Sequence, residues 1–415
     1  YGHGLVDLDA ATSPSDGGWT LSTGSTTSSF SFQNSTMSLN GAMSNASFDG
    51  SRPVMFLDKY GRNFYVELSS LIKTEKFSKN LYQTYSDFAI QSNIIESKIN
   101  RNLSFHITDF TPAISTESKV AGQNTTFSVA SSFDEYSYNF TFGNNISPDY
   151  AFSKSDNFGL PAKSLKSGHL NLSNPFTENF DNSTFVSSKI SNQNLELKLS
   201  LIETSHNDKL IKSSNDKSGY FSELFYSDAK NNYQISFESG FITEENSVLG
   251  SITSGAFGLA EESETYSSSI NMGFNLSENL SLFGNYYYGQ TDVKPMKNSL
   301  ISDYSELKSS SFTIGVASSR NIFADDNFAL SLSKPLSVSS GSAELNLPVS
   351  INSDGIIQTE NETINFYGEN DIYDLSGFYQ IKKDESIVEI GSKVEFDNQI
   401  NEARNTFMFR FSTKF

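Results

Sequence analysis

The second half of the chain alternates apolar and polar residues with a period of two. From Leu195 to Leu201 every second residue is leucine, and Glu196, Lys198 and Ser200 stand between them. Further runs of this kind recur up to residue 396. Because successive side chains of a strand point to opposite faces, each run predicts a strand with one apolar and one polar face. Each run has about the length of a strand that crosses a bilayer at a tilt.

The end of the chain is the most aromatic of these runs. Phe407, Phe409, Phe411 and Phe415 follow the same period, interrupted only by Thr413. A soluble sheet would cover such a face with a second layer, whereas a membrane barrel would turn it to lipid, with the last ring at the interface. The pattern therefore predicts an all-β fold, a transmembrane antiparallel β-barrel.

Counting the runs back from the C-terminus predicts about twelve strands, and the alternating stretch Tyr136–Phe142 is a candidate for one more. If the chain ends in the periplasm, the short turns Ser277–Asn279 and Asn352–Gly355 lie on that side and longer connections such as 244–263 lie outside. The runs around 342–367 leave an alternative open. Merging them restores twelve strands but weakens this division of the turns.

The segment 67–135 has a different pattern. Phe88, Ile90, Ile94 and Ile99 are spaced roughly as one face of a helix. This spacing predicts a helical segment that would thread the lumen of the barrel. A surface helix in a linker domain is an equally good interpretation.

Composition narrows the class of protein. The formal net charge of −19 argues against nucleic acid as a partner, because little in the chain would neutralise phosphates. No cysteine occurs, so neither a disulfide framework nor a thiolate site is available. No run of about eighteen apolar residues occurs, which excludes a transmembrane helix. The 35 Phe and 19 Tyr residues suit the aromatic girdles of a barrel.

Two N-terminal stretches resemble parts of a known family. Residues 1–11 read Tyr-Gly-His-Gly-Leu-Val-Asp-Leu-Asp-Ala-Ala and resemble the closing segment of a subtilisin-like peptidase domain. Residues 52–66 contain Asp58-Lys-Tyr-Gly61-Arg62-Asn-Phe64, which resembles the Asp-x-x-Gly-Arg-x-Phe segment that joins protease to barrel in subtilisin-like autotransporters of Gram-negative bacteria.

The resemblance extends into the alternating region. Residues 249–259, 282–291 and 333–343 are similar to the translocator barrel of these serine protease autotransporters. The family usually has Gln and Arg on either side of a Pro-Leu pair, where this chain has Lys334 and Ser337. These departures leave the role of both positions open.

The resemblance implies a division of the chain and a function. Residues 1–66 would be the end of the protease passenger and a linker, 67–135 the lumen-threading segment, and 136–415 the barrel. The barrel would carry the passenger across the outer membrane, in type V secretion, and hold it at the cell surface. The partners implied are outer-membrane lipid, the passenger, and the barrel assembly machinery, which would read Phe407, Phe409, Phe411 and Phe415. The barrel itself would be monomeric.

No residues that carry chemistry stand out. The Gly-Thr-Ser-Met-Ala setting of a subtilisin-like nucleophile does not occur in the sequence, so we expect no catalytic residue and no enzymatic activity in this chain. The four histidines, His3, His106, His169 and His206, have no partner at metal-ligand spacing and are interpreted as turn or surface residues. We expect no cofactor and no metal.

Charged residues on the polar faces are candidates for the lumen lining. They could bind a threaded segment or, in an open pore, select ions; a solvated wall that balances its own charges is an equally good interpretation. The candidates are Glu196, Lys198, Glu238, Glu389, Lys393 and Glu395. Two other functions stay open: a porin-like diffusion channel, and a soluble secreted adhesin or binding module whose apolar faces meet in a sandwich core.

Overall fold

A computed structural model gives the fold of most of the chain. It describes residues 12–14, 19–22, 29–32, 35–39, 41–74, 90–100, 103–112, 124–133, 135–146, 174–177, 180, 183–208, 213–228, 232–253, 255–297, 299–368, 371–383, 386–397 and 403–413. Within these ranges, none of the helices has the length and apolar character needed to cross a membrane.

One large antiparallel sheet makes up most of the described chain. It has fifteen strands, and they follow one another in chain order except where short strands outside the sheet intervene. The strands are β7 (Ile90–Asn100), β8 (Leu103–Pro112), β9 (Asn124–Phe133), β10 (Tyr136–Ile146), β11 (Ser183–Ser191), β12 (Leu195–Asp208), β13 (Ser213–Asp228), β14 (Tyr233–Glu245), β17 (Ala260–Ser277), β18 (Leu280–Pro295), β20 (Leu307–Ser319), β21 (Asp326–Ser340), β24 (Ile372–Lys383), β25 (Ser386–Asp397) and β26 (Ala403–Thr413).

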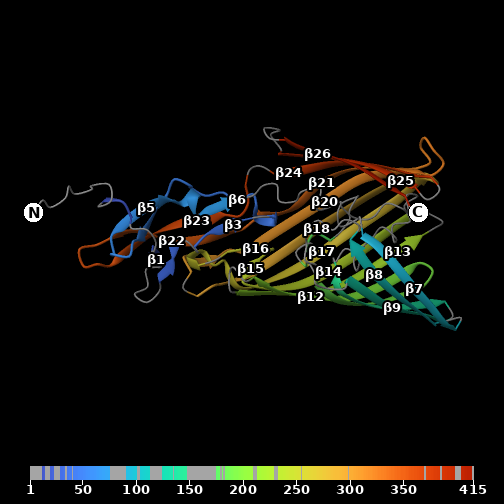
Figure 1. Cartoon of the computed structure of the whole chain (residues 1–415), viewed down its shortest axis with the longest axis horizontal. Helices are drawn as coiled ribbons and strands as arrows, with labels where there is room; N and C mark the ends of the chain where they lie inside the picture. Colours follow the sequence, from blue (N-terminus) through green and yellow to red (C-terminus); the bar gives the residue numbers. More distant parts are fainter. Residues whose placement is uncertain are drawn as a thin grey trace, which may run out of the picture.

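The large sheet curls about the long axis of the molecule, with its strands tilted to that axis (Figure 1). Its two edge strands are β7 and β26, and no ladder joins them within the described part of the chain. Short turns such as the one between β17 and β18 lie at one end, which we call the turn end. The longer connections, β14 to β17 among them, lie at the other, the loop end.

The two faces of the large sheet differ in a way that reverses the rule for soluble proteins. Large apolar side chains on its outer face are exposed, and they include Leu197, Leu199, Leu201, Leu224, Phe237, Phe274, Leu282, Tyr286, Ile314, Leu330 and Leu375. Buried positions on its inner face are largely polar, and they include Ser200, Ser236, Ser269, Asn271, Ser311, Thr313, Ser331 and Ser333. We call the space that the inner face encloses the lumen.

Several aromatic rings on the inner face lie over glycines of the neighbouring strand. Phe221 stands opposite Gly240 in the ladder of β13 and β14. A Cβ added at Gly240 would lie 2.6 Å from the Phe221 ring, closer than any real contact. Phe283 lies over Gly315 in the same way, with a corresponding distance of 2.4 Å. These glycines therefore make room for rings that a side chain would displace.

Short strands at the loop end form a second unit, which we call the cap (left in Figure 1). Its N-terminal part contains β1 (Thr20–Ser22), β2 (Ser29–Ser31), β3 (Met37–Leu39), β4 (Pro53–Leu57), β5 (Asn63–Glu67), β6 (Ile72–Thr74) and the 3-10 helices η2 (Gly41–Met43) and η3 (Leu68–Ser70). The rest comes from the loops of the large sheet and contains β15 (Ser247–Val248), β16 (Ser251–Ile252), η6 (Gly255–Phe257), β19 (Ile301–Tyr304), β22 (Ser342–Ile351) and β23 (Ile357–Asn365).

Apolar side chains from both parts of the cap share one core. From the N-terminal part, Leu21, Met37 and Val54 are fully buried. They belong to the same apolar cluster as Leu345 and Phe366, which come from the connection between β21 and β24. The N-terminal segment is therefore folded onto the loops of the large sheet.

The prediction of a helix in 67–135 is wrong where the structure describes that segment. Residues 68–70 form a short 3-10 helix, and β6 to β9 follow as strands. Ile90 and Ile94 are four residues apart, a spacing that puts them on one face of a strand as well as of a helix. Isoleucine is β-branched and favours strands, and β7 pairs with β8, in which Leu103, Phe105 and Ile107 alternate. Phe88 lies outside the described residues.

The expected count of about twelve strands also needs correction. Twelve of the fifteen strands, β10 to β26, begin at Tyr136 or later, and β7, β8 and β9 lie upstream, in the segment predicted to be helical. The hairpin of β22 and β23 leaves the sheet between β21 and β24, which pair directly with each other. Its tip at Asn352–Gly355 is therefore at the loop end, not among the short turns as predicted. Neither interpretation of 342–367 is right, because β22 and β23 are two separate strands and both lie outside the large sheet.

Crowding at the glycine positions can be tested by substitution. We expect Gly240→Val to destabilise the folded sheet by about 1–3 kcal/mol, because its side chain would overlap the Phe221 ring and Ser267 Oγ. Gly284→Val is the matched control, since a Cβ there has its nearest neighbour at 3.4 Å. Urea unfolding in detergent, followed by gel mobility, measures both. Equal stability of the two variants would contradict the packing described here.

Candidate functional site

Charged side chains gather on the inner face of β12, β13 and β14. Lys198 stands opposite Glu223, and Glu223 stands opposite Glu238. Lys198 interacts electrostatically with both of these carboxylates and with Glu196. Lys189 Nζ lies 3.3 Å from Glu196 Oε2. Two lysines therefore stand among three glutamates along this part of the wall.

A second charged group lies on β24, β25 and β26. Lys393 Nζ is 3.0 Å from Asp374 Oδ2 and 3.0 Å from Glu395 Oε1. Arg404 Nε lies 3.9 Å from Glu395 Oε2. Asp374 on β24 and Arg404 on β26 thus come from the two neighbouring strands. Lys393 and Glu395 are two positions apart on β25 itself. The lysine is the central cation, because two carboxylates share it.

Glu389 has partners on both neighbouring strands. Arg410 Nε on β26 lies 3.3 Å from Glu389 Oε2. Gln380 on β24 donates from Nε2 to Glu389 Oε1 at 2.9 Å. The carboxylate therefore joins three successive strands on the inner face.

The six predicted lumen residues all lie on the inner face, in two separate groups of three. Glu196, Lys198 and Glu238 are on β12 and β14, and Glu389, Lys393 and Glu395 are on β25. Sequence reasoning missed the partners that neutralise them, among them Glu223, Asp374, Arg404 and Arg410. The two-residue period could have placed the two arginines on the inner face, because both alternate with Phe407, Phe409 and Phe411 along β26.

A short piece of the connection between β10 and β11 lies inside the lumen. It consists of Asn174–Thr177 and Phe180, and we call it the lumen turn. Asn174, Phe176, Thr177 and Phe180 are each at most 3% exposed. Asn174 donates from Nδ2 to Glu238 Oε1 on β14. Among the described residues, this turn therefore occupies the lumen, and the described parts of 67–135 contain strands in place of the predicted threading helix.

Two glycines of the wall receive the aromatic rings of the lumen turn. A Cβ added at Gly289 on β18 would lie 2.5 Å from Phe176 Cζ. A Cβ added at Gly219 on β13 would lie 3.1 Å from Phe180 Cζ. The turn thus contacts three strands of the large sheet, at Glu238, Gly289 and Gly219.

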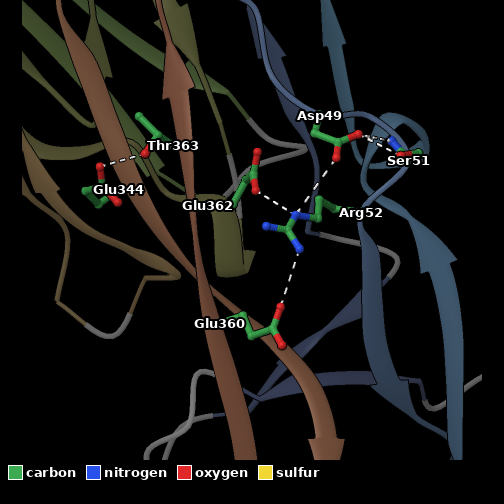
Figure 2. Close-up of polar contacts among 7 residues, drawn as sticks. All are labelled: Asp49, Ser51, Arg52, Glu344, Glu360, Glu362 and Thr363. Carbon is green, nitrogen blue, oxygen red and sulfur yellow. Dashed lines mark hydrogen bonds and ion pairs between the residues drawn. The ribbon is translucent and has the colours of Figure 1, made fainter.

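Ion pairs and backbone bonds join the N-terminal part of the cap to the β22–β23 hairpin. Figure 2 shows Arg52 between Asp49 and two glutamates of β23. Arg52 Nε lies 2.8 Å from Glu362 Oε2, and Arg52 Nη1 lies 3.4 Å from Glu360 Oε2. Ser47 and Asn365 exchange two backbone hydrogen bonds, at 2.7 and 3.0 Å. The cap is therefore fixed to the hairpin by its backbone as well as by its side chains.

The Asp-x-x-Gly-Arg segment forms the turn between β4 and β5. Asp58 accepts hydrogen bonds from the backbone N–H groups of Tyr60 and Arg62, at 2.9 and 3.0 Å. Its carboxylate also forms an ion pair with the Arg62 guanidinium, at 2.7 Å. Burial alone would raise the pKa of Asp58, but the hydrogen bonds from Arg62 and Tyr60 lower it to about 2. Gly61 supplies the left-handed backbone, with φ of 75°.

The aromatic residues of the last strand lie on the outer face. Phe407, Phe409 and Phe411 are 70%, 62% and 59% exposed. Phe415 lies outside the described residues. The three rings continue the apolar outer surface of β12 to β24 across the last strand of the sheet.

Metal-binding chemistry has no candidate cluster among the described side chains. No group of three or more His, Asp or Glu residues in the described part of the chain could hold a metal ion. His106 has Ser104 Oγ at 3.1 Å from its Nε2 as a neighbour on the same strand. The features that distinguish this chain are therefore its wall, its lumen turn and its cap.

An apolar outside, a polar and charged inside, and strands of bilayer-crossing length define a class of protein. They are the features of the wall of an outer-membrane β-barrel. The exposed outer face would otherwise place many large apolar side chains in water.

Comparison with known proteins gives distant structural similarities. No protein-family model and no curated protein sequence matches the chain. In vitro folded OmpT, an outer membrane protein of Vibrio cholerae, has a TM-score of 0.42 and 9% identity over 73% of this chain and 77% of its own. A bacterial polysaccharide outer membrane secretin has a TM-score of 0.36 and 8% identity over 77% and 87% of the two chains. Outer-membrane expressed OmpT of Vibrio cholerae has a TM-score of 0.32, with 9% identity over 66% and 78%.

The charge balance of the inner face can be tested at Lys393. We expect Lys393→Met to destabilise the protein by about 3–5 kcal/mol, because Asp374 and Glu395 would lose the cation that they share. Lys294→Met is the matched control, since the Lys294–Glu261 pair is exposed and should contribute less than about 1 kcal/mol. Unfolding by urea in lipid vesicles measures both. An unchanged midpoint for Lys393→Met would show that the lumen charges are solvated individually.

Proposed function

We propose that the chain is an outer-membrane anchor and translocator that holds an N-terminal passenger at the cell surface. The passenger suggested by the resemblance of residues 1–11 and 52–66 is a subtilisin-like serine protease. The chain itself would contribute no catalytic residue. Its partners would be outer-membrane lipid and, through the aromatic last strand, the barrel assembly machinery.

The observation that carries this proposal is where the N-terminal segment lies. The described residues between 19 and 74 pack on the loop end of the large sheet, and some of them share a core with the β22–β23 hairpin. The last strand, β26, runs toward the turn end, because its Thr413 pairs with Ser386 beside the β24–β25 turn. If long loops face outward, as in outer-membrane barrels, a domain that precedes residue 19 is presented on the outer side.

The cap gives this arrangement a physical basis. A passenger attached through a flexible tether alone could move freely relative to the membrane. Here the segment that would follow the passenger is joined to β23 by Arg52 and by the paired backbone of Ser47 and Asn365. The cap would therefore act as a fixed base for the passenger.

The two alternative functions fit the structure less well. A porin-like channel needs an open lumen, whereas the lumen turn of this chain is buried against Glu238, Gly289 and Gly219. A soluble module needs its apolar faces covered, whereas the outer face carries exposed large apolar side chains on most of the strands from β10 to β26.

Surface display tests the proposal directly. A small folded reporter domain is fused ahead of Tyr1, and the fusion is produced in a Gram-negative host. We expect antibody and added protease to reach the reporter on intact cells. A control carries an epitope in the turn Ser277–Asn279, at the opposite end of the sheet, and should be reached only after the outer membrane is permeabilised.

Two different failures of this experiment would point to two different errors in the proposal. A reporter that stays inaccessible while the turn epitope is exposed would mean that the chain has the reverse orientation. A reporter retained inside cells that nevertheless contain a folded, membrane-inserted barrel would contradict the translocator function and leave the membrane class intact.

A further inference from the structure

The lumen turn is a compact unit that Asn174 holds together. Asn174 Oδ1 accepts a hydrogen bond from the Phe176 backbone N–H at 2.9 Å. The Asn174 carbonyl accepts from Thr177 Oγ1 at 2.7 Å and from the Thr177 N–H at 3.0 Å. Phe180 N–H donates to the Thr177 carbonyl at 3.0 Å. The described backbone bonds of the turn are thus internal to it.

Side chains of the turn make its described contacts with the wall. Asn174 reaches Glu238 through its amide, and the rings of Phe176 and Phe180 lie against Gly289 and Gly219. We call this set of wall residues the seat. Ile202 and Phe221 stand beside Gly219 and complete the apolar side of the seat.

The seat is more apolar than the rest of the inner face. Most buried positions of the inner face are serine, threonine, asparagine or charged residues. Two fully buried phenylalanine rings from a loop would not remain in such a lumen without a matching apolar surface, because their burial is what favours the position. The glycines supply that surface by leaving open the space that a Cβ would fill.

We propose that the seat is a peptide-binding site inside the lumen, and that the lumen turn is its resident ligand and closes the lumen to hydrated ions and small polar solutes. The ligand class is a peptide turn with an amide side chain, a phenylalanine two residues later and a second one four residues after that. A hydrogen bond and two ring contacts hold it, so the turn can leave without breaking any strand pairing described here. This inference rests on the membrane-barrel class and is independent of which passenger the chain carries.

Conductance across planar lipid bilayers tests the closure. We expect the intact chain to conduct little, and the double variant Phe176→Ala/Phe180→Ala to conduct several-fold more. Asn174→Asp should have the same effect, because it places a second carboxylate beside buried Glu238. Phe237→Ala, on the outer face, is the control and should leave conductance unchanged. Heat-modifiable gel mobility shows that each variant is folded.

Binding in trans tests the seat itself. Residues 171–181 are replaced by a Gly-Ser segment of equal length, which leaves the seat without its ligand. A synthetic peptide of residues 172–182 should then lower the conductance of this variant, saturably, to the level of the intact chain. The same peptide with alanine in place of both phenylalanines should have no effect. If the Gly-Ser variant does not fold, the peptide is applied to the Phe176→Ala/Phe180→Ala variant.

Each result decides the proposal. An intact chain that already conducts as well as the variants, or a peptide that leaves the open variant unchanged, would overturn the plug and its seat. Neither result would affect surface display of the reporter, so the translocator proposal would stand. An intact chain that fails to insert into lipid at all would instead refute the membrane class on which both depend.

Discussion

A backbone that crosses hydrocarbon must hydrogen-bond to itself, because no water is available to its N–H and C=O groups. The antiparallel ladder of fifteen strands meets this constraint between neighbouring strands, and the two-residue period of the sequence follows from it. In the described part of this sheet, only the outer edges of β7 and β26 have no ladder partner. One face of every strand can then be apolar and meet lipid, while the other faces the lumen. A shift of one residue in any strand would exchange the two faces, so the alternation also fixes the register.

Once the outer face is committed to lipid, the polar inner face needs its own means of stability. Ion pairs that cross neighbouring strands, such as those of Lys393 and Glu389, balance charge where water is limited. Aromatic rings set over glycines fill space where two side chains would collide. The lumen turn combines an amide hydrogen bond to Glu238 with rings set over Gly289 and Gly219. The seat is therefore built from the same contacts as the wall around it.

The alternation predicted the strand class and the polarity of both faces, because a strict period leaves each residue only two directions. The six charged candidates lie on the polar face, and their role as a lumen lining stays a prediction. The alternation could not place β7, because Ile90 and Ile94 fit a helix and a strand equally well. The cap escaped prediction because its strands, such as Met37–Leu39, are too short to show a period. The lumen turn escaped because its rings are held by Gly219 and Gly289, which are far from it in sequence and carry no side chain to signal the contact.

The most direct test of the account is the lipid exposure of consecutive residues on one strand. The chain has no cysteine, so single cysteines can be placed at 196, 197, 198, 199, 200 and 201 without background. Each carries a fluorescent label in reconstituted vesicles, and quenching by lipids that bear a quencher in their acyl chains is measured. The account predicts strong quenching at 197, 199 and 201 and weak quenching at 196, 198 and 200. Quenching without alternation, or with the opposite phase, would contradict a wall that faces lipid with its leucines and the lumen with its charges.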